Sequence, residues 1–268
     1  MSGFGALAAR YEGFILDLWG VVHDGVRPYP GVAETLARLR DAGKPVVFLS
    51  NAPRRAATVA RALAAMGIGA ELYTAIMSSG EAVHAQLRDR LGEFSTLGRR
   101  FYHLGPPRDR DVFMGLELAQ MDHPAQAEFL LNTGPDDVLG AQRAEPYLPV
   151  LEAALRAGLP MVCANPDLEV IRDGQRILCA GYLARIYQAR GGVVIARGKP
   201  DPAIYAPTLA LLGTDRARTV AVGDSLRTDI AGAKAAGIDA CWVLSGIDAR
   251  GADAQGLPMV AVLDSLAW

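Results

Sequence analysis

Short apolar runs, each ending in a polar residue, alternate with stretches of helical spacing in the first part of this chain. The run at 14–16 ends in Asp17, and the run at 46–49 ends in Ser50 and Asn51. Helical spacing follows each run, at 32–41 and at 54–66. Runs of this length bounded by turn residues are typical of buried strands. Their alternation with helices predicts an α/β fold with a Rossmann-like, doubly wound parallel sheet.

The same alternation returns near the C-terminus. A predicted strand at 193–196 leads to Lys199, and one at 219–222 leads to Asp224. Between the two flanks, strands at 101–104, 129–131 and 160–163 and helices at 80–91, 148–157 and 180–189 indicate a separate α/β module. We therefore expect a core formed by residues 1–92 and 195–268, with a smaller α/β cap inserted at 93–194.

The overall composition excludes several classes of function. The 268 residues carry 27 basic and 29 acidic side chains, for a net charge of −2, so no global charge attracts nucleic acid or an anionic membrane. No apolar stretch is long enough to span a membrane, and no signal peptide is evident. Three cysteines without a Cys-x-x-Cys pair favour reduced thiols over disulfides or zinc. We expect a cytoplasmic protein.

Polar residues at four strand ends suit phosphoryl transfer. A strand-end aspartate can attack phosphorus and form an acyl phosphate. A hydroxyl and an amide can bind phosphoryl oxygens, a lysine can neutralise developing charge, and carboxylates can hold Mg²⁺. Each of these residues alone also has an ordinary interpretation as a helix cap or turn residue. Their order and spacing favour a shared site.

In that order, the strand ends resemble the four motifs of the haloacid dehalogenase superfamily. The matching segments are Asp-Leu-Trp-Gly-Val at 17–21, Ser-Asn at 50–51, Gly-Lys-Pro at 198–200 and Gly-Asp-x-x-x-x-Asp at 223–229. Only the interval between Ser50 and Lys199 is long enough to hold a cap domain. That position, with Ala-Asn-Pro-Asp at 164–167, resembles subclass IIA, the branch with a C2-type cap that includes sugar and nucleotide phosphatases.

The resemblance implies a Mg²⁺-dependent hydrolase that acts on a phosphorylated small metabolite through an aspartyl phosphate. Dimerisation through the cap is common in this branch, which leaves a homodimer open. The implied roles are nucleophile and Mg²⁺ ligand for Asp17, phosphoryl binding for Ser50 and Asn51, electrostatic catalysis and phosphoryl binding for Lys199, and Mg²⁺ ligation for Asp224, Asp229 and the main-chain carbonyl of Trp19.

Trp19 departs from the family pattern, which has a second aspartate at this position. That aspartate protonates the leaving oxygen and later activates water, and an indole can do neither. General acid–base catalysis contributes on the order of 10²–10⁴-fold. His23 and Asp24 could substitute as acid or base, but we favour their interpretation as loop residues, because Asp24 begins an Asp-Gly turn signal.

Other polar residues have two interpretations. Asn165 and Asp167 of the cap shape a turn or face the substrate. Arg54 and Arg55 hold an anion or form a solvated helix end. Because of Trp19, two alternative functions stay open: a catalytically impaired protein that binds a phosphorylated ligand, and a hydrolase of another bond, such as carbon–halogen, which requires no proton on the leaving group.

Overall fold

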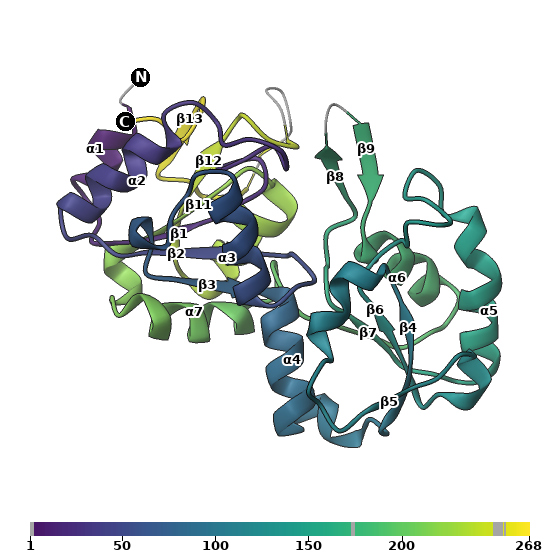
Figure 1. The fold of residues 1–268 in the computed structure, drawn as a ribbon. Helices are drawn as coiled ribbons and strands as arrows, with labels where there is room; N and C mark the ends of the chain where they lie inside the picture. Colours follow the sequence, from purple (N-terminus) through teal and green to yellow (C-terminus); the bar gives the residue numbers. More distant parts are fainter. Residues whose placement is uncertain (1–2, 173–174, 249–253, 255) are drawn as a thin grey trace.

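The computed structural model describes residues 3–172, 175–248, 254 and 256–268, and it contains two parallel sheets lying side by side (Figure 1). The larger sheet has the order β13-β12-β11-β1-β2-β3, so β1 lies between β11 and β2. Its strands are β1 (Gly13–Leu16), β2 (Val46–Ser50), β3 (Ala75–Ser78), β11 (Thr219–Gly223), β12 (Asp239–Val243) and β13 (Ala261–Leu263).

Helices cover both faces of this sheet, which explains why its strands are mostly apolar. On one face, Phe14 and Leu16 of β1 pack with apolar residues of α1, α2 and α3. On the other face, Ile15 packs with residues of α7 and α8. The helices are α1 (Phe4–Ala8), α2 (Val32–Asp41), α3 (Ala56–Ala65), α4 (Ser79–Asp89), α5 (Leu148–Arg156), α6 (Ala180–Ala189), α7 (Tyr205–Leu212) and α8 (Ala231–Ala236).

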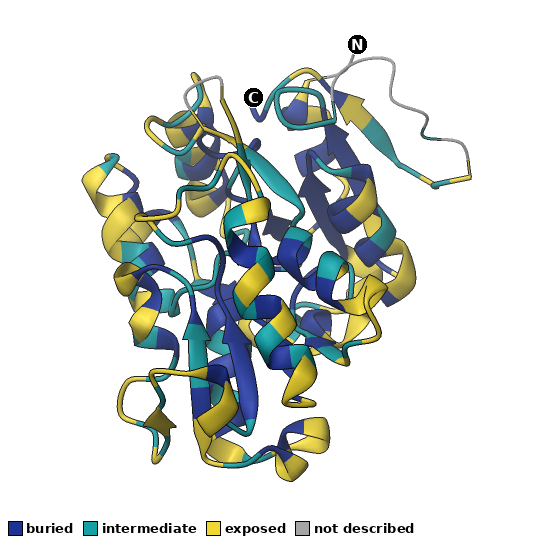
Figure 2. Cartoon of the chain, turned by 90° about the vertical axis from the view of Figure 1, so that its right-hand side faces the viewer, coloured by how far each residue is buried: buried dark blue, intermediate teal, exposed yellow. Residues whose placement is uncertain are grey.

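The second sheet has the order β10-β7-β6-β4-β5 and its own core. Leu130 and Met161 pack with α5 and α6 on one face, while Phe129 and Leu131 pack with α4 on the other. Figure 2 shows the buried strands between helices whose outer sides are exposed. The strands are β4 (Arg100–Leu104), β5 (Ala119–Gln120), β6 (Phe129–Asn132), β7 (Met161–Cys163) and β10 (Val194–Ala196).

An antiparallel hairpin of β8 (Glu169–Arg172) and β9 (Gln175–Leu178) extends from the second sheet toward the first (Figure 1). The loop before β8 contains Asp167, and α6 follows β9. The hairpin therefore places cap residues beside the carboxyl ends of the core strands.

The predicted α/β class is confirmed, and so is the parallel core sheet with a second α/β unit. The sequence interpretation missed β3, β5 and the β8–β9 hairpin. A 3₁₀ turn over Pro202–Ile204 leads into α7, and a π-helical turn over Leu226–Ile230 leads into α8. Because α4 and β10 pack with the second sheet, the domain boundaries after residues 92 and 194 stay a prediction.

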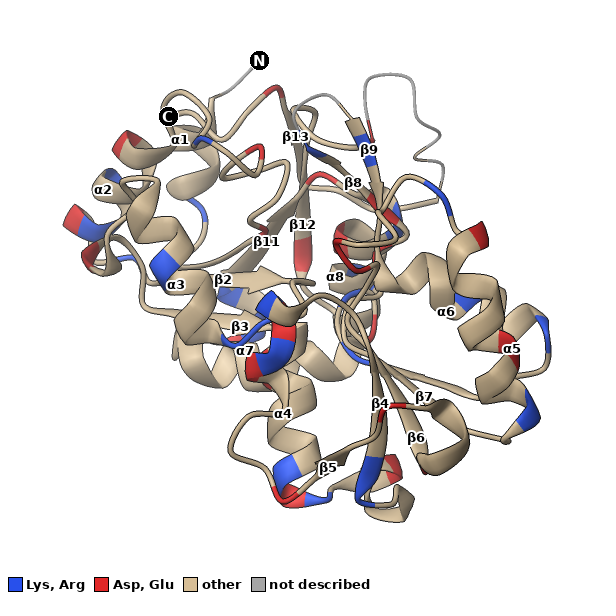
Figure 3. Cartoon of the chain, turned by 45° about the vertical axis from the view of Figure 1, so that its right-hand side comes forward, with Lys and Arg blue, Asp and Glu red and all other residues tan. Residues whose placement is uncertain are grey.

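In the view of Figure 3, basic and acidic positions are interspersed along the elements of both parts of the chain. Among the described residues, no helix combines the length and apolar character needed to cross a membrane.

Candidate active site

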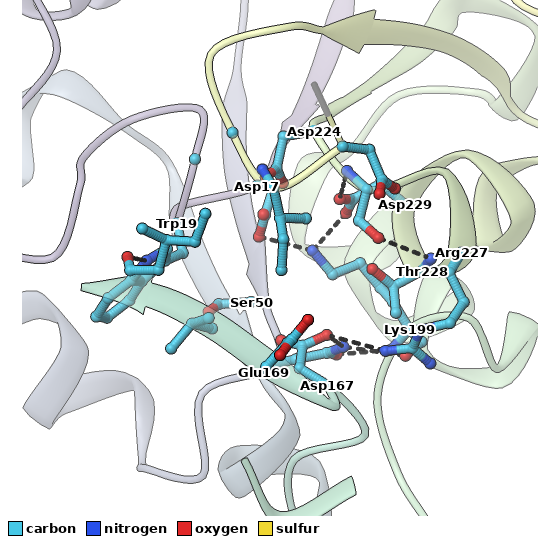
Figure 4. A pocket seen from close by; sticks show the side chains of 18 of the residues that line it. Asp17, Trp19, Ser50, Asp167, Glu169, Lys199, Asp224, Arg227, Thr228 and Asp229 are labelled. Atoms are coloured by element: carbon cyan, nitrogen blue, oxygen red, sulfur yellow. Dashed lines mark hydrogen bonds and ion pairs between the residues drawn. The ribbon is translucent and has the colours of Figure 1, made fainter. Parts of the chain in front are cut away.

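Three neighbouring strands of the core sheet end at one cavity of about 450 Å³. Asp17 follows β1, Ser50 ends β2 and Asp224 lies directly after β11. The carboxyl ends of parallel strands share one edge of the sheet, where open α/β folds bind ligands. The β8–β9 hairpin lines the other side of the cavity, so core and cap residues face each other across it (Figure 4).

Lys199 connects two of the carboxylates at this edge. Its Nζ donates hydrogen bonds to Asp17 Oδ1 and to Asp229 Oδ1, each at 2.6 Å, and its side chain is buried. Burial alone would lower the pKa of Lys199, but the charges of Asp17 and Asp229 outweigh it and raise that pKa. The lysine therefore stays charged and holds the Asp17 carboxylate in a fixed orientation.

The carboxylates of Asp17, Asp224 and Asp229 form a buried cluster. One oxygen of each lies within 4.8 Å of the others. Burial, together with the like charges of Asp17 and Asp229, raises the pKa of Asp224 well above its usual range. One lysine cannot neutralise three carboxylates, and oxygen donors are the ligands that Mg²⁺ prefers. The three side chains therefore fit a divalent cation.

The backbone around Asp224 leaves no room for larger residues. Gly20 has a φ of +85°, and a Cβ at that position would lie 2.2 Å from Asp224 Oδ2. Trp242 Nε1 donates to the Asp224 carbonyl at 3.0 Å, and the Ile247 N–H donates to Asp224 Oδ2 at 2.6 Å. The short distance at Gly20 explains why a glycine stands at this position after β1. The hydrogen bond from Trp242 holds the main chain of Asp224, and the one from Ile247 orients its carboxylate.

Ser50 and Asn51 lie at the cavity but make different contacts. Ser50 Oγ accepts a hydrogen bond from the Ala52 N–H at 3.2 Å, so its own proton is available to a ligand oxygen. Asn51 holds the Lys199 main chain, because its Oδ1 accepts from the Lys199 N–H at 2.7 Å and its Nδ2 donates to the Lys199 carbonyl at 3.0 Å. Asn51 Nδ2 also donates to Asp167 Oδ1 of the cap at 2.9 Å.

Trp19 uses its indole N–H to bind the cap. Its Nε1 donates to the Ile171 carbonyl of β8 at 2.8 Å, and its ring lies edge-on to His23 with centroids 5.4 Å apart. The side chain lines the cavity and has no second proton to give. The indole thus connects core and hairpin at the position of the family's second aspartate.

The two candidate replacements in the following loop are engaged locally. His23 Nδ1 accepts from the Gly25 N–H at 3.0 Å, burial lowers the pKa of His23 to about 4, and the residue does not line the cavity. Asp24 Oδ1 accepts from the Val26 and Arg27 N–H groups, and these bonds lower the pKa of Asp24. These contacts fit the interpretation of both as loop residues.

The two cap candidates lie in one turn. Asn165 Oδ1 accepts from the Asp167 N–H at 3.0 Å, which shapes the turn before β8. Asp167 lines the cavity together with Glu169 and Arg176 of the hairpin. Sequence reasoning missed both hairpin residues. The Asp-Gly dipeptide at 173–174, between two runs containing β-branched residues, was the available hairpin signal.

Arg54 and Arg55 both form ion pairs with carboxylates of neighbouring elements. Arg54 Nε donates to the buried carboxylate of Asp109 in the cap at 2.7 Å. Arg55 forms a two-bond ion pair with Glu81 of α4, and its main-chain N–H donates to Asp111 at 3.0 Å. Both arginines therefore attach the cap to the loop that follows Ser50 and Asn51.

Comparisons with known proteins agree with this geometry. A family model described as haloacid dehalogenase-like hydrolase matches residues 14–119, and a HAD-hydrolase-like model matches residues 196–268. The chain is 30% identical to chronophin of Bos taurus over 259 residues, which covers 90% of this chain and 83% of the relative. It is 29% identical to ribonucleotide monophosphatase NagD of Escherichia coli (strain K12) over 242 residues, or 87% of each.

A solved structure extends the agreement to the whole fold. The crystal structure of a haloacid dehalogenase-like hydrolase from Brucella suis is 28% identical, matches with a TM-score of 0.88 and covers 100% of both chains. Fold, motif order and relatives lead to the same assignment. The chain belongs to the haloacid dehalogenase-like hydrolases, in the subclass IIA branch.

Proposed function

We propose that this chain hydrolyses the phosphomonoester of a small metabolite, of the sugar phosphate or nucleotide class, with Asp17 as the nucleophile. The observation that carries the proposal is the contact of Lys199 Nζ with Asp17 Oδ1 beside two further buried carboxylates and the free hydroxyl proton of Ser50. Nucleophile, anion-binding groups and cation ligands thus meet at one cavity. The relative NagD, named a ribonucleotide monophosphatase, supports the same substrate class.

In this mechanism the protein's own groups orient the reaction. Lys199 and Ser50 bind phosphoryl oxygens, and Lys199 fixes the Asp17 carboxylate for attack on phosphorus. Asp17, Asp224 and Asp229, with the main-chain carbonyl of Trp19, would hold Mg²⁺, which when bound neutralises negative charge on the phosphoryl group. The P–O bond to the leaving group breaks as the Asp17–phosphorus bond forms, and water then releases phosphate from Asp17.

Phosphate release from a substrate panel tests the proposal. Purified protein with Mg²⁺ is assayed on nucleoside monophosphates, sugar phosphates, phosphoglycolate, pyridoxal phosphate, 4-nitrophenyl phosphate and acetyl phosphate. We expect turnover that Asp17→Asn abolishes, while Asp122→Asn, a matched change at an exposed cap aspartate, preserves it. Absence of turnover together with tight, Mg²⁺-dependent binding of a phosphorylated ligand would favour the catalytically impaired alternative, which the engaged indole of Trp19 makes the second candidate.

The cytoplasmic location and the homodimer stay predictions. Size-exclusion chromatography with light scattering measures the oligomeric state directly.

A further inference from the structure

Proton transfer to the leaving group needs a donor on the cap side of the cavity. The attacking and leaving oxygens lie roughly in line through phosphorus, so a leaving oxygen lies opposite Asp17. Lys199 binds on the Asp17 side, and the N–H of Trp19 is used on Ile171. Figure 4 shows Asp167 and Glu169 on one side of the cavity and Asp17 and Asp224 on the other. The donor should therefore come from the turn or hairpin of the cap.

Most of the remaining carboxyl groups that line the cavity are already engaged. Asp24 is exposed and accepts two main-chain hydrogen bonds, which keep it ionised. Glu169 forms an ion pair with Arg176 within the hairpin. Asp248 Oδ2 accepts from the Leu226 N–H at 2.6 Å. Of the described carboxyl groups that line the cavity outside the core cluster, Asp167 is the one that accepts a hydrogen bond from Asn51, the residue next to Ser50.

The contacts of Asp167 hold one oxygen and leave the other open. Its Oδ1 accepts from Asn51 Nδ2 at 2.9 Å and lies 3.8 Å from Arg227 Nη2. No described residue donates a hydrogen bond to its Oδ2, and the side chain is 26% exposed. Asn51 follows Ser50, the proposed phosphoryl-binding hydroxyl. The carboxyl group is therefore fixed one residue from the phosphoryl site, with a free oxygen at the cavity.

The surroundings of Asp167 also increase its affinity for a proton. Burial raises the pKa of Asp167 above its usual range, and the charge of Asp229 acts in the same direction. Lys199, Arg227 and the Asn51 hydrogen bond oppose this increase without cancelling it. A carboxyl group whose pKa is raised toward neutrality is a better general acid than an ordinary surface aspartate.

We propose that Asp167 is the general acid and base of this enzyme, in place of the aspartate that Trp19 replaces. The inference rests on the phosphomonoesterase function proposed above. In the first step, Asp17 forms a bond to phosphorus, the ester P–O bond breaks, and the leaving oxygen takes the proton of Asp167. In the second step, water attacks phosphorus, its proton passes to the Asp167 carboxylate, and the Asp17–phosphorus bond breaks. Both protons are thereby accounted for, and the enzyme returns to its starting state.

Leaving-group dependence tests this role. Asp167→Asn is compared with wild type on glycerol phosphate, whose leaving alkoxide needs a proton, and on 4-nitrophenyl phosphate, whose leaving phenolate does not. We expect the first-step rate to fall on the order of 10²–10⁴-fold for glycerol phosphate and only slightly for 4-nitrophenyl phosphate. We also expect phosphorylated Asp17 to accumulate with 4-nitrophenyl phosphate, because the base for the second step is missing.

Other outcomes would overturn the inference or the proposed function separately. An equal loss on both substrates without accumulated phosphoenzyme would leave Asp167 a positioning residue only and overturn its acid–base role. An inactive wild type would overturn the phosphomonoesterase function itself. Asp167→Glu, which keeps a carboxyl group, is the second variant should the asparagine variant fail to fold. Asp167→Glu should retain more activity on glycerol phosphate than Asp167→Asn does. Relative to wild type, it should lose more activity on glycerol phosphate than on 4-nitrophenyl phosphate. Equal losses on the two substrates would again overturn the acid–base role. Asp122→Asn serves as the matched control.

Discussion

Asp224→Asn should stabilise the cation-free protein while weakening its response to Mg²⁺. Lys199 contacts Asp17 and Asp229 directly, whereas no described basic side chain contacts Asp224. At the 4.8 Å limit of the cluster and an effective dielectric constant of about 20, each like-charge pair costs about 3 kcal/mol. Two such pairs, offset in part by Lys199, leave a net gain of roughly 2–4 kcal/mol at a pH where Asp224 is ionised. The gain is smaller at lower pH, because the raised pKa of Asp224 lets it take up a proton there.

Thermal unfolding with and without Mg²⁺ measures both effects. At about 2–4 °C per kcal/mol, the melting temperature of cation-free Asp224→Asn should lie roughly 5–15 °C above that of wild type. Mg²⁺ at about 100 times its dissociation constant should stabilise wild type by about 2.7 kcal/mol, and the variant by much less. Asp122→Asn should change neither quantity. A wild type that does not respond to Mg²⁺, or a variant less stable than wild type without Mg²⁺, would refute the reasoning.

Three further changes test other contacts. Trp19→Phe removes the hydrogen bond to the Ile171 carbonyl, which should cost about 1 kcal/mol. Amide hydrogen exchange in the β8–β9 hairpin should then be about fivefold faster. Unchanged exchange would contradict the role of Trp19 in holding the hairpin. Burial alone would raise the pKa of Glu81, but hydrogen bonds from Arg55 and a main-chain N–H lower it below 4.5. The ionised Glu81 therefore stabilises the folded protein above pH 4.5, and this contribution to the free energy of unfolding is lost as the pH falls. In Glu81→Gln, the free energy of unfolding measured with urea should therefore fall less steeply as the pH is lowered below 4.5. An unchanged pH dependence would show that other groups cause the loss of stability in acid. Lys199→Met should lower kcat/KM for a phosphate ester on the order of 10²–10³-fold, and a wild-type rate would exclude its electrostatic role.

Much of the core could be predicted from sequence because its strands are buried on both faces. Such strands are continuous apolar runs, and the polar residues that end them mark the ligand-binding edge of the sheet. Asp17, Lys199 and Asp224 were identified by that local pattern, and the structure places them at one cavity. Strand β3 was missed because its few apolar residues run directly into the polar start of α4.

The contact of Trp19 with the cap could not be predicted. It joins residues 152 positions apart through a main-chain carbonyl, and no periodicity encodes such a pair. The place of the Asp167 carboxyl group at the cavity likewise depends on a contact between distant parts of the chain, the hydrogen bond that Asn51 donates to it. For both residues, tertiary packing decides the chemistry, while the sequence supplies only the residue type.

Detection of a phosphoryl group on Asp17 during turnover is the most direct test of the central claim. The enzyme is mixed with a substrate found in the panel, quenched in acid within the first turnovers and digested for mass spectrometry. We predict one phosphoryl group on the peptide that contains Asp17, and none in Asp17→Asn. Turnover without a covalent phosphoryl group, or a phosphoryl group on another residue, would contradict the account.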